Sequence, residues 1–180
     1  EDALWPYQKT LLLADRKGRN QPRDATRFAK KVAGRLELAD CLLPARDPAD
    51  SKKRAARGWV LPLDREDGDW KSDHWPWSSS KPIPLFPGDS PVGLRLPLGD
   101  LPESALQRAL TVECTGGSLR LFIPPLEWSG FRELLAILSE TVAESKLTDI
   151  VLCGYKPSGC PDAVRTFGLA ADPGVLEINL

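Results

Sequence analysis

Glu177 and Asn179, close to the end of the sequence, are the residues whose types and spacing best suit chemistry. They follow Asp172-Pro173-Gly174, a turn signal in which Pro fixes φ at the first corner and Gly takes the position with φ > 0. From Val175 onward, apolar and polar residues alternate, which predicts a strand. Glu177 and Asn179 then face one side of it, about 6.6 Å apart. The opposite side carries Leu176, Ile178 and Leu180.

A carboxylate and an amide oxygen at that spacing can hold one hard cation between them. Mg²⁺ is usually bound by one or two carboxylates together with waters and substrate phosphates. We therefore predict that Glu177 and Asn179 are metal ligands. The alternative is a surface hairpin whose outer face is simply polar, and the alternation alone fits both interpretations.

The elements that would position these residues are mostly strands. Two amphipathic helices are expected, from Asp24 as N-cap to about Leu38 and from Ser129 to Lys146, because apolar residues recur at helical spacing. Gly116-Gly117 predicts a tight hairpin. The pattern indicates an α+β fold with a mainly antiparallel sheet and helices packed on one face. The expected strands are 8–14, 59–63, 82–86, 92–98, 110–115, 118–123, 149–155, 164–170 and 175–180.

The composition is that of one domain with its own core: 180 residues, net charge −1. Residues 1–57 hold 14 Lys and Arg against 8 Asp and Glu, so this strand–helix–linker region is basic, and the sheet-rich body at 58–180 carries a net charge of −7. No apolar run is long enough to span a membrane, and the start carries no signal peptide. Because the chain has no Met, starts with Glu1 and stops abruptly at Leu180, we expect an excerpt of a longer polypeptide, or an incomplete one. With nothing secretory in the sequence, we expect a cytoplasmic location.

The basic run Lys52-Lys53-Arg54 with Arg57 can meet an anionic partner or be a solvated loop. No nucleic-acid-binding motif accompanies it, so we expect no nucleic-acid partner. Four of the six Trp lie between residues 59 and 77. They can stack on a base or a sugar, or anchor a long loop to the body. Asp67 and Asp69 in the same loop can bind a cation or be solvated.

The four cysteines form no C-x-x-C pair, which argues against a zinc site. We expect all four thiols, at Cys41, Cys114, Cys153 and Cys160, to be free. A cysteine nucleophile needs a base, and His74 is the sole histidine. A Cys–His pair is therefore possible, and nothing in the sequence selects its cysteine.

Several motifs together resemble one family. The segment from Asp172 to Asn179 is similar to D-P-G-V-I-E-V-N, and residues 87–98 are similar to P-G-D-S-P-M-G-x-R-L-P-L, both of the putative amidoligase family. Weaker similarities lie at 108–113 (R-T-A-L-C-V-E in the family), at 121–125 (V-F-M-P-P) and at 154–157 (G-Y-P-P). The resemblance covers most of the chain, and most clearly residues 81–180.

The resemblance implies a fold and an activity. The family's domain is often fused behind a transglutaminase-like domain in large bacterial proteins. Its members are inferred to be ATP-dependent carboxylate–amine ligases related to glutamine synthetase and glutamate–cysteine ligase. We therefore expect ATP and Mg²⁺ as cofactors, a carboxylate and an amine as substrates, with a peptide among the candidates, and a transglutaminase-like domain as partner.

Such a ligase activates a carboxylate as an acyl phosphate, which requires basic groups around the phosphates. Arg95 is the expected clamp, both catalytic and cofactor-binding, because its planar guanidinium fits a phosphate or carboxylate. A buried Arg95 can instead be paired with a nearby acidic residue. Glu127 is the second catalytic candidate, although a glutamate at a helix start often only complements the helix dipole. Glu113 is a weaker candidate.

The chain also departs from the family's pattern. Cys153 stands where the family usually has Glu, which exchanges a hard oxygen donor for a soft thiol. The family's last motif continues into His-Pro, whereas this sequence stops at Leu180, so we expect the 180 residues alone to be inactive. Two hypotheses follow: a ligase domain, or a non-catalytic remnant that binds a peptide or partner domain as a scaffold. We further predict that strands 92–98 and 175–180 share one sheet, because separate sheets would remove the structural basis for a site shared by Arg95 and the metal ligands.

Overall fold

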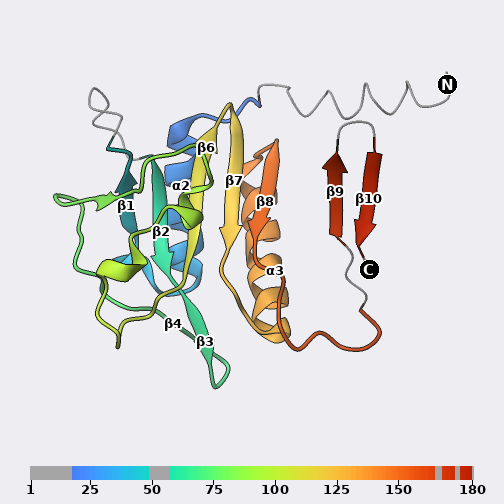
Figure 1. Cartoon of the computed structure of the whole chain (residues 1–180). Coiled ribbons are helices and arrows are strands. Elements are labelled where there is room, and N and C mark those ends of the chain that lie inside the picture. Colours follow the sequence, from blue (N-terminus) through green and yellow to red (C-terminus); the bar gives the residue numbers. More distant parts are fainter. Residues whose placement is uncertain (1–17, 49–56, 165–167, 173–174, 180) are drawn as a thin grey trace.

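The centre of the protein is a mixed six-stranded sheet, ordered β5-β1-β2-β6-β7-β8 (Figure 1). The computed structural model describes residues 18–48, 57–164, 168–172 and 175–179, the last two ranges by their backbone. The central pairs are antiparallel, and the two edge pairs, β1 with β5 and β7 with β8, are parallel. The strands are β1 (Leu43–Arg46), β2 (Gly58–Pro62), β5 (Ile83–Pro84), β6 (Ala109–Thr115), β7 (Ser118–Ile123) and β8 (Ile150–Gly154).

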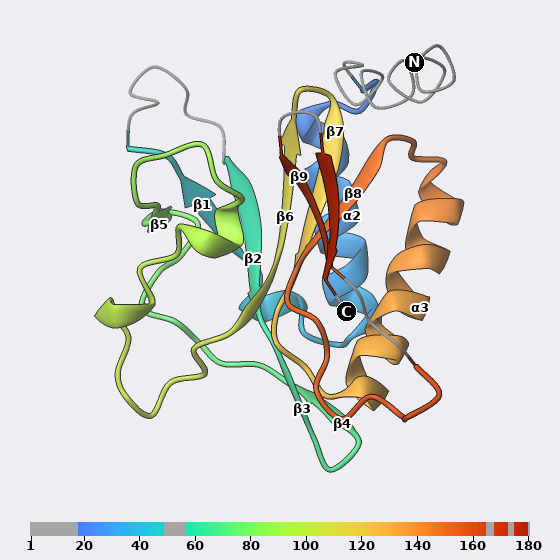
Figure 2. The same ribbon diagram turned by 45° about the vertical axis from the view of Figure 1, so that its right-hand side comes forward.

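Both helices, α2 (Pro22–Arg35) and α3 (Trp128–Ser145), cover the same face of this sheet (Figures 1 and 2). Their apolar sides and alternate residues of the central strands form one core, whose fully buried members include Phe28, Leu121 and Leu134. This confirms the predicted α+β class and the helices on one face. No helix in the described part of the chain is long and apolar enough to cross a membrane.

The residues that precede the two helices lie two or three positions earlier than predicted. Gln21 is the N-cap of α2, and the carboxylate of Asp24, the predicted cap, accepts the Gln21 N–H at 2.7 Å from inside the first turn. Glu127 rather than Ser129 precedes α3. In both cases an acidic residue lies near the positive end of the helix dipole, where it is favourable.

Charged residues link the two helices on their solvent side. Lys31 Nζ lies 2.5 Å from Glu144 Oε2, and Arg35 Nη1 lies 2.9 Å from Glu140 Oε2. Arg35 also pairs with Glu144. Hydrogen bonds from Lys31 and then Arg35 hold the pKa of Glu144 below its ordinary value. These pairs are exposed, so each adds little stability on its own.

A second core lies on the face of the sheet away from the helices. It is closed by the long segment between β4 (Asp69–Lys71) and β6, shown in green in Figure 1. Its buried residues are Leu43, Ala45, Val60, Trp75, Ile83, Leu85, Val92, Leu96, Leu101 and Ala109. The sheet is therefore buried on both faces over β1, β2 and the start of β6.

The tryptophan-rich segment is anchored to the body, as one of the two interpretations predicted. Residues expected to be irregular form a small hairpin of β3 (Asp64–Glu66) and β4, joined by Asp67-Gly68 with φ of 51° and 88°. Each anchoring indole donates one hydrogen bond. The bonds run from Trp59 to Thr26 Oγ1 (3.0 Å), from Trp70 to Glu133 Oε1 (2.8 Å) and from Trp75 to the Leu106 carbonyl (3.0 Å).

The predicted strand at 92–98 is wrong. Val92–Leu94 and Leu98–Asp100 are single 3₁₀ turns, η3 and η4. Pro91 and Pro97 carry no N–H to donate to a ladder, which excludes a regular strand around them. The alternating leucines instead divide between solvent and the second core: Leu94 is 57% exposed and Leu96 is 7% exposed.

The predicted sharing of a sheet is therefore also wrong. The terminal strand forms as expected, as β10 (Val175–Asn179), and pairs antiparallel with β9 (Gly168–Asp172) in a separate two-stranded sheet. β9 is displaced from the range predicted for it, 164–170. The strand predicted at 8–14 lies outside the described residues.

The residues before α2 form a strap across one end of the sheet. Gly18 and Asn20 donate backbone hydrogen bonds, each 2.9 Å long, to the carbonyls of Gly116 and Gly117 at the β6–β7 turn. Asn20 also donates from its side chain to the carbonyl of Thr148, just before β8. Both turn glycines have positive φ, 60° and 81°, as a tight hairpin requires.

We predict that Leu134→Ala, in the helix–sheet core, lowers the free energy of unfolding by about 2–5 kcal/mol, because Leu134 is completely buried and a cavity would remain. Leu94→Ala is the matched control at an exposed position and should change stability by less than about 0.5 kcal/mol. Urea denaturation of both variants measures the difference. Equal losses would show that α3 does not pack on the sheet as described.

Candidate functional site

A buried carboxylate marks the candidate site. Glu113 lies on β6, in the middle of the sheet, and points away from the helices; only 2% of it is exposed. Its Oε1 accepts the backbone N–H of Val92 at 3.0 Å, and its Oε2 accepts the hydroxyl of Thr115 at 3.1 Å. A buried charge is costly unless it is paired and hydrogen-bonded, so these contacts are what allow Glu113 to be there.

Two arginines approach this carboxylate from neighbouring strands. Arg120 stands directly opposite Glu113 across the β6–β7 hairpin, and its Nη1 lies 3.7 Å from Oε1. Arg57 immediately precedes β2, and its Nε lies 3.9 Å from Oε2. Both side chains are about 30% exposed. Arg57 Nε is nonetheless buried and has no hydrogen-bond acceptor among the described residues.

The segment 87–98 lies against the same face of the sheet. Its Val92 N–H is bound by Glu113. Gly93 passes so close to Phe122 on β7 that a Cβ there would lie 2.2 Å from the ring. A side chain at position 93 would therefore push this segment off the sheet, which gives a physical reason for the Val-Gly pair in the motif.

Arg95, predicted as the anion clamp, is buried (3% exposed) and already paired. Its Nη2 lies 2.5 Å from Asp47 Oδ2, and its Nε donates to the Phe86 carbonyl at 2.7 Å. Of the two interpretations of Arg95, the structure shows the pairing with a nearby acidic residue, Asp47. Its Nη1 is buried without an acceptor among the described residues. The catalytic and cofactor-binding roles of Arg95 stay predictions, with Nη1 as the atom that can serve them.

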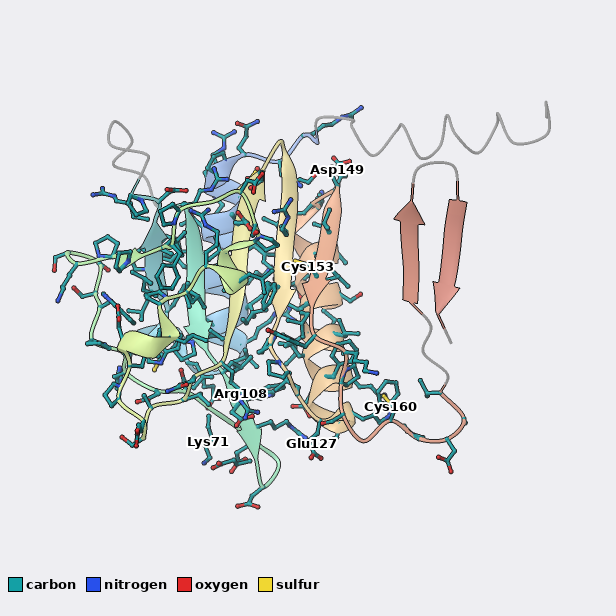
Figure 3. All side chains as sticks on the ribbon, in the orientation of Figure 1. Lys71, Arg108, Glu127, Asp149, Cys153 and Cys160 are labelled. Carbon is teal, nitrogen blue, oxygen red and sulfur yellow. The ribbon has the colours of Figure 1, made fainter. Side chains whose placement is uncertain are left out.

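Cys153 lies midway along β8 (Figure 3), in register with Phe122, on the Glu113 face. Its thiol lies 3.6 Å from the Leu121 carbonyl, to which it can donate. Burial raises the pKa of this thiol; the charge of Arg120 lowers it and that of Glu113 raises it. Both charges of the cluster therefore act on the thiol of Cys153.

Glu127, the second predicted catalytic residue, lies elsewhere. It is exposed at the start of α3, at the lower end of the molecule in Figure 3, away from Cys153. Its carbonyl accepts the Phe131 N–H at 2.9 Å, and the N–H of Trp128 after it donates to Ser158 at 2.8 Å. Its position is that of a helix-dipole charge, and a catalytic role stays a prediction.

The comparison with protein families now bears on this geometry. A family model described as "Putative amidoligase enzyme" matches residues 45–108 and 100–180. The chain belongs to this amidoligase family. No curated protein and no solved structure matches it.

The metal ligands predicted from the amidoligase motif lie on β10. In the backbone register Glu177 is paired with Ala170 and Asn179 with Gly168. Their side chains lie outside what the structure describes, and the metal-ligand assignment stays a prediction. Within residues 18–48 and 57–164, no group of three His, Cys, Asp or Glu side chains could hold a metal ion.

The site that the structure describes is thus suited to anions. Arg57 and Arg120 flank one carboxylate, that of Glu113, and keep guanidinium N–H groups that it does not bind. Guanidinium groups bind phosphate or carboxylate through charge-assisted hydrogen bonds. Sequence reasoning gave Glu113 little weight, named Arg57 only as part of a basic run that can meet an anionic partner or be a solvated loop, and missed Arg120. One signal was readable: a two-residue Gly116-Gly117 turn places residues 113 and 120 opposite each other, with opposite charges.

We predict that Cys153 is alkylated by iodoacetamide with a pH midpoint above that of an ordinary thiol, because burial raises its pKa. Arg120→Gln removes the charge that favours the thiolate, so the midpoint should rise further, and Glu113→Gln should lower it. Peptide-resolved mass spectrometry measures each rate, with Cys160 as the internal control. A midpoint that neither variant moves would place Cys153 outside the cluster.

Proposed function

We propose that this chain is part of an ATP- and Mg²⁺-dependent ligase that joins a carboxylate to an amine as an amide. The family match supports an amide-forming ligase. The observation that carries the proposal further is the buried Glu113 with Arg57 and Arg120, lying beneath the family's 87–98 motif. We further propose a glutamine synthetase/glutamate–cysteine ligase-like fold for the whole domain, a cytoplasmic location, and a transglutaminase-like partner domain.

Arg57 and Arg120 are the proposed anion-binding groups. Each retains guanidinium N–H groups that Glu113, itself engaged by Val92 and Thr115, does not bind at hydrogen-bond distance. Their partial exposure leaves them reachable by a solute, whereas Arg95 is held by Asp47. The buried Nε of Arg57 without an acceptor fits an anion well, since a bound oxygen would satisfy it.

Glu113 acts as a positioning residue in this proposal. It holds η3 through Val92 and fixes the two guanidinium groups from between them, on β6. ATP, when bound, would supply the phosphoryl group that converts a substrate carboxylate into an acyl phosphate, from which an amine displaces phosphate. Arg57 and Arg120 would orient the phosphates or the carboxylate and balance their charge.

Mg²⁺ would be held by Glu177 and Asn179, a carboxylate and an amide of the kind it prefers, and would offset phosphate charge. Arg95 Nη1 would contribute a further donor to the anion. Glu127 is retained as a catalytic candidate for a substrate that extends to the start of α3. The substrates are proposed by class, as a carboxylate and an amine, with a peptide among the candidates.

A non-catalytic scaffold that binds a peptide or partner domain is the second candidate. Two observations favour it. Cys153 offers a thiol that points to the Leu121 carbonyl where the family's usual Glu would offer an oxygen ligand. Arg95 is neutralised by Asp47. Both hypotheses use the same anion-binding face, so they differ in whether nucleotide is turned over.

We predict that the protein binds Mg²⁺-ATP and that Arg120→Gln weakens binding about tenfold or more, since a hydrogen bond to a charged group contributes about 1.5–3 kcal/mol. Arg57→Gln should act in the same direction. Arg132→Gln is the matched control, because Arg132 is exposed on α3 beside Trp128. Isothermal titration calorimetry, with and without Mg²⁺, makes the comparison. Equal weakening by Arg132→Gln would remove the assignment of the anion site.

We also predict that Glu177→Gln abolishes Mg²⁺-dependent nucleotide turnover by the full-length protein while leaving it folded. Gln keeps the size of the side chain and loses the charge that a hard cation requires, at a cost of several kcal/mol in the transition state. Glu103→Gln, at an exposed position, is the control. Turnover of Glu177→Gln at the parent rate would disprove the metal-ligand role and leave the scaffold hypothesis.

A further inference from the structure

A cysteine and the only histidine of the sequence lie close together, one after the end of α2 and one in the segment between β4 and β6. Cys41 ends the short 3₁₀ helix η2 (Ala39–Cys41), and His74 follows β4. Cys41 Sγ lies 3.9 Å from His74 Nδ1, within hydrogen-bonding range for sulfur. Cys41 is half-buried and His74 is exposed, so a small solute can reach the pair.

The backbone on both sides of His74 is fixed by side-chain hydrogen bonds. Asp73 and Trp75, on either side of His74, both form hydrogen bonds with Leu106, which precedes β6. Ser72 forms one with Pro62, the last residue of β2. These bonds join Ser72 Oγ to the Pro62 carbonyl (2.6 Å), the Leu106 N–H to Asp73 Oδ2 (3.1 Å), and Trp75 Nε1–H to the Leu106 carbonyl (3.0 Å). The imidazole is therefore held beside Cys41 by the fold.

The other three thiols have a different kind of neighbour. Each is within hydrogen-bonding distance of a backbone carbonyl, which can accept the thiol hydrogen but cannot take the proton away. The acceptors are Asn20 for Cys114 (3.4 Å), Leu121 for Cys153 (3.6 Å) and Pro157 for Cys160 (3.6 Å). Burial also raises the pKa of Cys114 and of Cys153, which disfavours their thiolates.

We propose that Cys41 and His74 form a thiol–imidazole pair that makes Cys41 a nucleophilic modification site for small disulfides. With its hydrogen on Nε2, the imidazole accepts the Cys41 proton at Nδ1. The thiolate attacks one sulfur of the disulfide, a new S–S bond forms, and the old S–S bond breaks. The departing thiolate takes up the proton from the imidazolium, so the disulfide is the only co-reactant.

This site is independent of the proposed ligase. It uses neither Arg57, Arg120 nor Glu113, and it requires no nucleotide or metal. A mixed disulfide on Cys41 would add bulk between the end of α2 and the segment that closes the second core, two parts that the native pair holds together. Modification would therefore bear on the packing of that segment.

The test is exposure of the whole chain to oxidised glutathione at neutral pH, with site-resolved mass spectrometry of the four cysteines. We expect Cys41 to be modified first, at least tenfold faster than Cys160, which is also half-buried. His74→Asn keeps a polar atom near the position of Nδ1 but is not a base. It should slow Cys41 about tenfold and leave Cys160 unchanged.

Two further measurements keep the outcome decisive. Cys41→Ser should remove the fast reaction entirely. Slow modification of the partly buried Cys114 in every variant reports that the fold is retained. If Cys41 reacts no faster than Cys160, or if His74→Asn reacts at the parent rate while Cys114 stays slow, the pair has no nucleophilic function.

Discussion

The arrangement of this protein depends on one buried carboxylate. Glu113 sits in the centre of the sheet with almost no exposure, and a charge in that position persists only if donors surround it. The backbone N–H of Val92 and the hydroxyl of Thr115 donate hydrogen bonds to it. The guanidinium groups of Arg57 and Arg120, 3.9 and 3.7 Å away, balance its charge. Breaking such a buried pair from one side typically costs about 3–5 kcal/mol, so each partner is constrained by the others.

The hydrogen bond from Val92 to Glu113 joins the segment 87–98 to β6, two parts of the chain that are separate in sequence. The segment 87–98 contains no regular strand. It is attached by the packing of Val92 and Leu96 in the second core and by contacts of Val92 with Glu113, Gly93 with Phe122 and Arg95 with Asp47. The sheet is covered by helices on one face and by this segment on part of the other. Glu113 is fixed beside this segment by the Val92 N–H, and the partly exposed side chains of Arg57 and Arg120 next to it are reachable by solutes.

Much of the fold could be predicted from local patterns. The two helices and the β6–β7 hairpin follow from periodicity and from Gly116-Gly117, and the terminal hairpin follows from alternation. The strand expected at 92–98 failed because the leucine alternation there is interrupted by Pro91 and Pro97, whose missing N–H groups outweigh it. The β3–β4 hairpin was missed although its Asp-Gly turn is readable.

The site was less predictable, for a physical reason. Arg120 opposite Glu113 is encoded by hairpin register, which the sequence contains. Arg95 and Asp47 are 48 residues apart in sequence, and Cys41 and His74 are 33 apart. Each contact results from the packing of whole segments against each other, so no local sequence pattern predicts it. Pairing of β7 with β8 is likewise set by the α3 crossover, and it brings Cys153 onto the Glu113 face.

The strap before α2 bears on the order in which this chain can fold. Its hydrogen bonds join Gly18 and Asn20 to the Gly116-Gly117 turn and to Thr148, across roughly a hundred residues or more. Closing so long a loop costs entropy that is recovered only once both sides exist, so such contacts form late. The β6–β7 hairpin, α3 and β8 are contiguous and can assemble first. The strap and α2 then dock onto a surface made by these elements, so α2 is among the last to be secured.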